Sequence, residues 1–159
     1  MTSPVLRGIR LLGVIALLAA CAPGPVAPLP PPAIEDARAL LREVVDAGIA
    51  RDWERLCANA SGTCESELQG NEERAPTEAP RVAAAEVHQG SSSGEVSSAG
   101  GVLFVLCGVD GLGEAYESEV LVFDAGSRLL ATAAVYWTGT QVSSGLPAVT
   151  TGEGGRSRC

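Results

Sequence analysis

The chain has 159 residues, enough for one modest domain, and its 19 acidic residues outnumber 11 basic ones to give a net charge of −8. A surface of this sign repels the phosphates of nucleic acids and the headgroups of anionic lipids. The composition therefore argues against nucleic acid as a partner. It also means that any attachment to a membrane needs something other than charge.

Residues 1–20 have the zones of a bacterial export signal. Arg7 and Arg10 make a positive start, and the apolar run that follows is shorter than the roughly 20 residues of a membrane-spanning helix. The run closes in Leu18-Ala19-Ala20-Cys21, which resembles the lipobox of bacterial lipoproteins. The resemblance implies cleavage before Cys21, lipid on its thiol, and a chain held on the extracytoplasmic face of the cell membrane. The alternative is an ordinary secretory signal, with Cys21 joining a disulfide.

Residues 21–33 are rich in proline, which favours an extended polyproline II conformation. About eleven such residues at ~3.1 Å each make a semi-rigid tether of roughly 35 Å. Without the leader, nine basic residues face 19 acidic ones, for a net charge of −10. Because this charge opposes adhesion, the lipid on Cys21 is expected to provide the contact with the membrane.

Helical periodicity begins directly after the prolines. Apolar residues recur every three or four positions over 34–47, and Glu35 and Asp36 suit the positive end of the helix dipole. Asp52 is a candidate N-cap for a second short helix from Trp53 to about Cys57. Residues 58–80 are predicted to be loop.

The period then changes to two, which predicts strands over 81–89, 102–109, 117–123 and 128–138, the last being the longest. A flexible connector is expected over 90–101. Helices followed by strands with short connections indicate an α+β fold, with one or two N-terminal helices packed on a curved antiparallel sheet of about four strands. The domain is expected to cover 34–145, before a flexible tail over 146–159 that ends in Cys159.

The corner from Ala47 to Cys57, together with a meander ending in Val135-Tyr136-Trp137, resembles small secreted domains of the nuclear-transport-factor-two-like (cystatin-like roll) type. The resemblance implies a curved sheet wrapped around a helix, with a conical pocket that some members use for catalysis and others for binding or dimerisation. The catalytic residues of enzymatic members have no counterparts in this sequence. Only the fold is therefore carried over.

With Cys21 assigned to lipid, an even set of cysteines remains, which favours two disulfides with three possible connectivities: Cys57, Cys64, Cys107 and Cys159. A local bridge between Cys57 and Cys64 is preferred, because one ends a helix and the other follows a Ser-Gly turn. Cys107 would then bond to Cys159 and fix the end of the chain to the sheet, which would stabilise the folded state by roughly 3–5 kcal/mol. The alternative is a free Cys107 and an unpaired Cys159. A zinc site is not expected, since C-x₂-C is lacking, and neither is a cofactor.

Two patterns suggest chemistry without supporting it. Residues 90–94 match G-x-S-x-G around Ser92, but no helix is predicted after it and the only histidine, His88, precedes it. His88 could pair with Glu86 or Asp110, although a solvated position is expected. An acidic cluster offers oxygen ligands without the spacing of a calcium loop, and is expected to be a solvated sheet edge: Asp110, Glu114, Glu117 and Glu119.

The candidate binding patch is aromatic: Trp53, Tyr136 and Trp137. Adjacent strand residues point to opposite faces, so one of Tyr136 and Trp137 would lie outside the core near Trp53; the alternative is that all three belong to the core. We expect a non-catalytic binding or accessory domain of the cell envelope, for an envelope protein or a small apolar ligand. The alternatives are a small-pocket enzyme using Asp52 or Glu119 as base, and a purely structural envelope component.

Overall fold

The computed structural model describes residues 29–93, 96–98, 100–142 and 159. The predicted leader, Cys21, most of the tether, residues 143–145 at the end of the predicted domain and residues 146–158 of the predicted tail lie outside the described residues. Two helices open the domain, α1 (Ile34–Ala50) and α2 (Trp53–Ala58), and a third, α3 (Cys64–Leu68), precedes a 3₁₀ turn, η1 (Glu72–Arg74). The strands are β1 (Arg81–His88), β2 (Ser91–Ser93), β3 (Val96–Ser98), β4 (Gly101–Val109), β5 (Ala115–Asp124) and β6 (Leu129–Ala131), followed by a 3₁₀ turn, η2 (Tyr136–Thr138).

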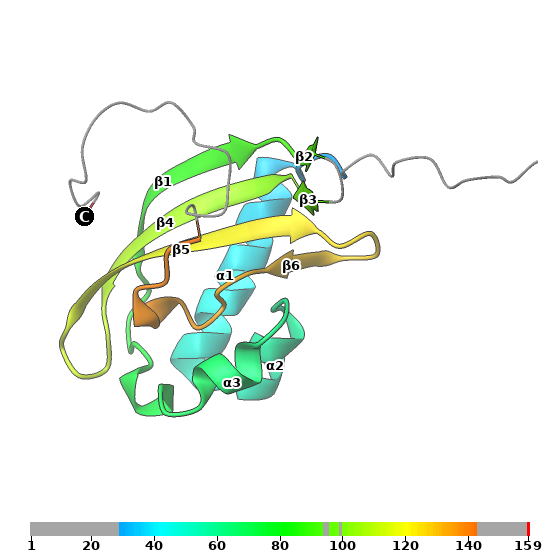
Figure 1. Cartoon of the computed structure of the whole chain (residues 1–159). Helices are drawn as coiled ribbons and strands as arrows, with labels where there is room; N and C mark the ends of the chain where they lie inside the picture. Colours follow the sequence, from blue (N-terminus) through cyan, green and yellow to red (C-terminus); the bar gives the residue numbers. More distant parts are fainter. Residues whose placement is uncertain (1–28, 94–95, 99, 143–158) are drawn as a thin grey trace, which may run out of the picture.

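Four strands pair antiparallel in the order β1-β4-β5-β6, with α1 packed across one face of the sheet (Figure 1). The α+β class, the N-terminal helices and the four-stranded antiparallel sheet are thus confirmed. The β6 edge is continued by the chain after α2. There the N–H of Ser61 donates to the Ala131 carbonyl and the N–H of Ala131 donates to the Asn59 carbonyl, each at 2.9 Å. These bonds tie α2 to the sheet.

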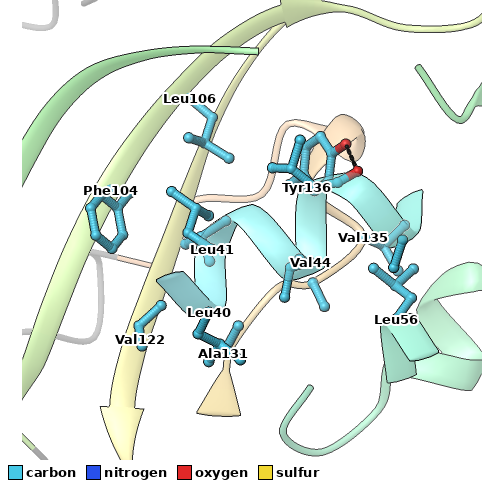
Figure 2. Packing of buried hydrophobic residues seen from close by; sticks show 14 of the residues in the cluster. Leu40, Leu41, Val44, Leu56, Phe104, Leu106, Val122, Ala131, Val135 and Tyr136 are labelled. Carbon is cyan, nitrogen blue, oxygen red and sulfur yellow. Dashed lines mark hydrogen bonds between the residues drawn. The ribbon is translucent and has the colours of Figure 1, made fainter. Parts of the chain in front are cut away.

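The core lies between α1 and the sheet. Leu40, Leu41 and Val44 lie on the face of α1 turned to the strands, as their three- and four-residue spacing requires. Figure 2 shows this face against Phe104 and Leu106 of β4, with Val122 of β5 nearby. Buried side chains thus occupy the interior in which the roll resemblance implies a conical pocket.

The helix α1 runs three residues beyond its predicted end because Gly48 is a packing residue and not a terminator. A Cβ at Gly48 would lie 3.1 Å from both the Trp137 ring and the Tyr136 hydroxyl oxygen. The helix ends instead at Arg51, whose left-handed φ of 55° allows its N–H to donate to the Gly48 carbonyl at 3.2 Å. Glycine therefore lets two aromatic rings approach the helix backbone.

The predicted long strand over 128–138 is wrong. The strand β6 ends at Ala131, the chain turns at Ala133 with φ of 52°, and Tyr136–Thr138 forms the 3₁₀ turn η2. The segment passes between α1 and β5 and contacts both elements. Because it is buried from several sides, its apolar residues occur at both parities, which removes the alternation that marks a half-buried strand.

Two segments predicted to be irregular also contain short elements. The loop over 58–80 holds α3 and η1, and the connector over 90–101 holds the β2–β3 ladder. None of these elements exceeds five residues. Such lengths are too short for hydrophobic periodicity to reveal.

The sheet is also buried on the face opposite α1. Leu103 and Val105 of β4 and Leu121 of β5 are less than a tenth exposed, and alternation places them away from the helix. Cys107 lies on this same face and is bonded to Cys159. Burial on both faces explains why β4 is an almost continuous apolar run.

Candidate functional site

The structure contains two disulfides, Cys57–Cys64 and Cys107–Cys159, with Cα separations of 5.4 and 5.6 Å. Both the two-bridge state and the preferred pairing are confirmed. One bridge closes a local loop of seven positions and the other spans 52. Because thiols stay reduced in most bacterial cytoplasms, the two bridges point to an extracytoplasmic location.

A concave surface lies between α2 and α3. It is a shallow hollow of about 480 Å³, which we call the α2–α3 groove, and it is lined by Trp53, Glu54, Cys57, Ala58, Glu65 and Leu68. A second hollow of about 300 Å³ shares Cys57 and Glu65 with it and extends over residues 62–66. The local disulfide is therefore part of this surface and joins its two helices.

Trp53 forms one wall of the groove and is backed by the core. Its ring centroid lies 6.2 Å from that of Trp137, and Trp137 in turn meets Tyr136 edge-on at 5.1 Å. The indole N–H of Trp137 donates to the Asn71 carbonyl at 2.9 Å. Since Trp137 is fully buried, the half-buried Trp53 rests on a fixed support.

The expected aromatic patch is reduced to this one ring. Tyr136 and Trp137 are both 0% exposed, because η2 turns both side chains inward where a strand would have turned one outward. The Tyr136 hydroxyl donates to the Val45 carbonyl at 3.4 Å (Figure 2). Burial raises the pKa of this hydroxyl, helped by the nearby Tyr116 and Asp46. The residue of this pair that faces Trp53 is Trp137, and their contact is part of the core, which is the alternative that the sequence left open.

The two ionisable side chains that line the groove, Glu54 and Glu65, are both exposed carboxylates. The Trp53 ring, Ala58 and Leu68 line the same groove. The groove thus combines an apolar surface with negative charge. A complementary ligand would carry positive charge beside an apolar group.

The carboxylates considered as catalytic bases do not line this groove. Asp52 caps α2, where its Oδ1 accepts the N–H of Arg55 at 3.1 Å. Glu119 is buried in β5, where its Oε2 accepts the N–H of Val142 at 2.9 Å. Each therefore has a structural role.

His88 is buried, contrary to the expectation that it is solvated. It is 6% exposed at the end of β1, and its Nε2 lies 3.8 Å from Glu86 Oε2. Ser92 lies in β2, and the next described element after it is the strand β3. The strand–serine–helix geometry of a hydrolase elbow is therefore not formed there.

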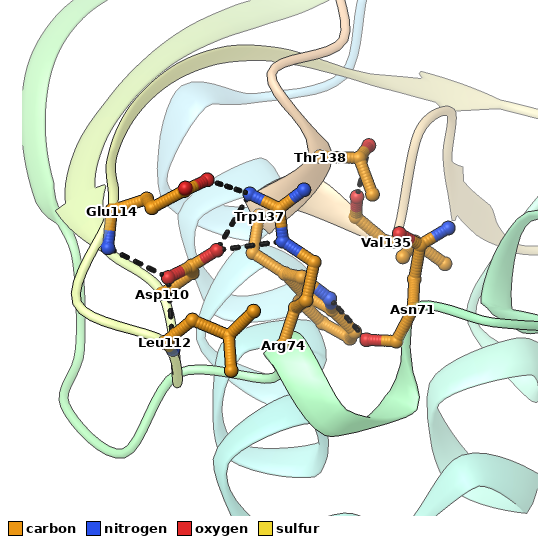
Figure 3. A network of polar contacts seen from close by, with 8 residues as sticks. All are labelled: Asn71, Arg74, Asp110, Leu112, Glu114, Val135, Trp137 and Thr138. Carbon is orange, nitrogen blue, oxygen red and sulfur yellow. Dashed lines mark hydrogen bonds and ion pairs between the residues drawn. The ribbon is translucent and has the colours of Figure 1, made fainter.

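The acidic cluster at the β4–β5 turn is not a solvated edge, because Asp110 is buried against Arg74. Arg74 Nη2 lies 2.7 Å from Asp110 Oδ2 and 2.9 Å from Glu114 Oε2 (Figure 3). The positive charge that these two carboxylates bind is therefore the guanidinium of Arg74. Across the described ranges, no three His, Cys, Asp or Glu side chains gather so as to hold a metal ion.

The sequence matches no protein-family model, no characterised protein and no solved structure. Within the part of the chain that the structure describes, no helix has the length and apolar character needed to cross a bilayer. The function proposed below therefore rests on the geometry of the α2–α3 groove and on the sequence.

Proposed function

We propose that this protein is a membrane-anchored extracytoplasmic lipoprotein whose domain binds an envelope partner, without catalysis, through the α2–α3 groove. The observation that carries the proposal is a groove whose aromatic wall, Trp53, is held from behind by the buried Trp137. A preorganised aromatic surface binds at low entropic cost. The assignment of a non-catalytic role is supported by the structural roles of Asp52 and Glu119, the two carboxylates considered as bases, neither of which lines the groove.

Lipid anchoring at Cys21 rests on the lipobox resemblance and the proline-rich segment after it, and the two disulfides support export. The course of α1 supports a role directed away from the membrane. The described chain enters α1 at one end of the domain, and α2 and α3 lie at the other (Figure 1). An anchor before residue 29 would therefore leave the groove pointing outward.

We also propose that the domain is related in fold to the nuclear-transport-factor-two-like rolls. A long helix packed on an antiparallel sheet supports this relation. The binding surface differs in place, however. In the roll it is the conical interior, whereas here the interior is occupied by core side chains and the groove lies outside, beyond the end of α1.

The chemistry of the groove favours a peptide segment of the partner that places basic residues beside apolar ones. A guanidinium or ammonium group over the Trp53 ring gains cation–π stabilisation, and Glu54 and Glu65 are placed to pair with it. An apolar neighbour would cover Leu68 and Ala58. Neither an anionic nor a purely apolar ligand uses all of these groups.

A calorimetric titration tests this assignment. The detergent-solubilised chain is titrated with a synthetic peptide that alternates leucine and arginine, and with a matched peptide that alternates leucine and glutamate. We expect binding of the first peptide only, weakened about tenfold or more by Trp53→Ala, as for a central aromatic contact.

The double variant Glu54→Gln with Glu65→Gln should also weaken binding. The pair Glu43→Gln with Glu78→Gln removes the same charge from exposed positions outside the groove and serves as control. Equal binding of the two peptides, or unchanged binding by Trp53→Ala, would show that the groove is not the site.

A further inference from the structure

The turn over residues 110–114 joins β4 to β5, and exposed apolar residues lie at its apex and at the two strand ends beside it: Leu112, Val109 and Ala115. Leu112 is 65% exposed and Val109 is 56% exposed, and both lie beside the polar residues of the turn. Single exposed apolar residues are common on protein surfaces and need no explanation. What distinguishes Leu112 is the network of hydrogen bonds that fixes the turn around it, which we call the frame.

The frame begins with the Asp110 carboxylate. Its Oδ1 accepts the N–H of Leu112 at 3.0 Å and the N–H of Glu114 at 2.9 Å, and its Oδ2 accepts Arg74 Nε at 2.7 Å (Figure 3). The backbone adds two bonds across the turn. Gly113 N–H donates to the Asp110 carbonyl at 3.0 Å, and Asp110 N–H donates to the Glu114 carbonyl at 2.9 Å.

The turn is also fixed to η1 through its backbone. The N–H of Gly111 donates to the Arg74 carbonyl at 2.8 Å, and a Cβ at Gly111 would lie 2.7 Å from the Ala75 carbonyl oxygen. Gly113 has φ of 86°, which favours glycine. Leu112 therefore stands between two glycines that the backbone requires.

A rigid turn with an exposed leucine at its apex suits a preorganised contact. Most of the ordering cost of binding falls on mobile groups, and this backbone is already ordered. A side chain that enters a partner's pocket from a rigid support is typical of binding hot spots. We propose that Leu112 is an anchor residue that inserts into an apolar pocket, rimmed by basic residues, on a partner protein.

The charges around the tip define the rim of that pocket. Glu114 is 69% exposed beside Leu112, Glu73 is exposed on η1, and the mature chain is strongly acidic. A partner with a basic rim is complementary, whereas an anionic bilayer and a second copy of this acidic chain are repelled. This proposal does not depend on occupancy of the α2–α3 groove.

Site-specific photo-crosslinking in intact cells tests the anchor. The photoreactive residue p-benzoylphenylalanine replaces Leu112 in the full chain, and in a control it replaces Val87, which is 51% exposed on β1. Val87 pairs with Val102, at the end of the sheet away from the turn. We expect one defined protein adduct from position 112 and none of that mass from position 87.

The captured protein, identified by mass spectrometry and purified, is then titrated with the unmodified chain and two variants. Leu112→Asp should weaken binding at least tenfold, Val87→Asp should change it less than twofold, and added salt should weaken it. Because Leu112 is exposed, Leu112→Asp should keep its circular dichroism spectrum and Tm. An adduct with lipid only, an adduct with the chain itself, matching adducts from both positions, no adduct, or full binding by Leu112→Asp overturns the proposal.

Discussion

Asp110 shows how one buried carboxylate can organise a turn. Its side chain is 0% exposed, and it accepts bonds from two backbone N–H groups and one guanidinium. Burial alone would raise the pKa of this carboxyl, but the N–H of Glu114, the Arg74 guanidinium and the N–H of Leu112 together lower it below the ordinary value. Arg74 lies 36 positions away, so the sequence revealed the turn but not the partner.

We predict that Asp110→Asn lowers the Tm by several degrees at neutral pH, because an amide accepts these bonds more weakly than a carboxylate. Since the folded pKa is depressed, the stabilisation is complete above the model-compound value of 3.8 and is lost as the pH falls through the folded value. The difference in Tm between the wild type and the variant should therefore shrink in acid. Thermal unfolding followed by circular dichroism from neutral to acidic pH measures it.

Asp124→Asn is the matched control for this measurement. Asp124 also caps a turn, at a more exposed position, where its Oδ1 accepts the N–H of Gly126 at 2.7 Å. Its replacement should cost less and depend less on pH. A constant difference between the wild type and Asp110→Asn across the whole pH range would refute the electrostatic account.

At the scale of elements, length and environment decide what could be predicted. The helix α1 and the strands β1, β4 and β5 run eight residues or more and were predicted within three residues at each end. The helix α3 and the ladder β2–β3 are too short to show a period. The groove was missed for the same reason, since one of its two helices was predicted to be loop.

The disulfides were predictable because chain distance and local turns restrict the pairing, but their consequences for the groove were not. Cys57 ends α2 and lines the groove, while Cys64 begins α3. Cys107 and Cys159 join the opposite face of the sheet to a distant part of the chain. The two bridges should therefore separate binding from overall stability.

We predict that one pair of substitutions has the larger effect on stability and the other pair has the larger effect on binding. Cys57→Ser with Cys64→Ser opens a short loop and should cost roughly 2–3 kcal/mol of unfolding free energy, whereas Cys107→Ser with Cys159→Ser should cost roughly 4 kcal/mol. Binding of the leucine–arginine peptide should weaken more in the first pair, because α2 and α3 lose their link. Guanidinium unfolding and calorimetry give the two quantities, and equal effects of both pairs on binding would contradict the prediction.

At the scale of the whole molecule, the domain has two distinct ends. The described chain enters α1 at one end, and the α2–α3 groove and the β4–β5 turn lie toward the other (Figure 1). Both faces of β4 and β5 are buried, whereas the edge strand β1 exposes Val82 and Val87, so the surfaces available for recognition are at the ends and edges of the sheet. The lipid anchor expected at Cys21 would determine which end faces the membrane.

We predict that Cys21→Ser releases the protein from the membrane fraction, because the thiol that receives the lipid is lost and the net negative charge does not favour adhesion. The pair Cys57→Ser with Cys64→Ser is the control, since it removes two cysteines of the local disulfide without touching the lipobox. Fractionation of cells combined with intact-mass measurement tests this. A Cys21→Ser protein that stays with membranes and differs from the wild type only by the substituted atom would show that Cys21 is not lipidated.

The direction of α1 also bears on how tightly the groove must bind. Its 17 residues span about 25 Å, and a polyproline tether would add roughly 35 Å. An anchored groove is then confined to a thin layer over the bilayer, where a partner fixed in the same layer meets it at a high effective concentration. Under such confinement low intrinsic affinity would be sufficient to keep a shallow groove occupied, and rapid release would let one anchored domain serve many partner molecules in turn.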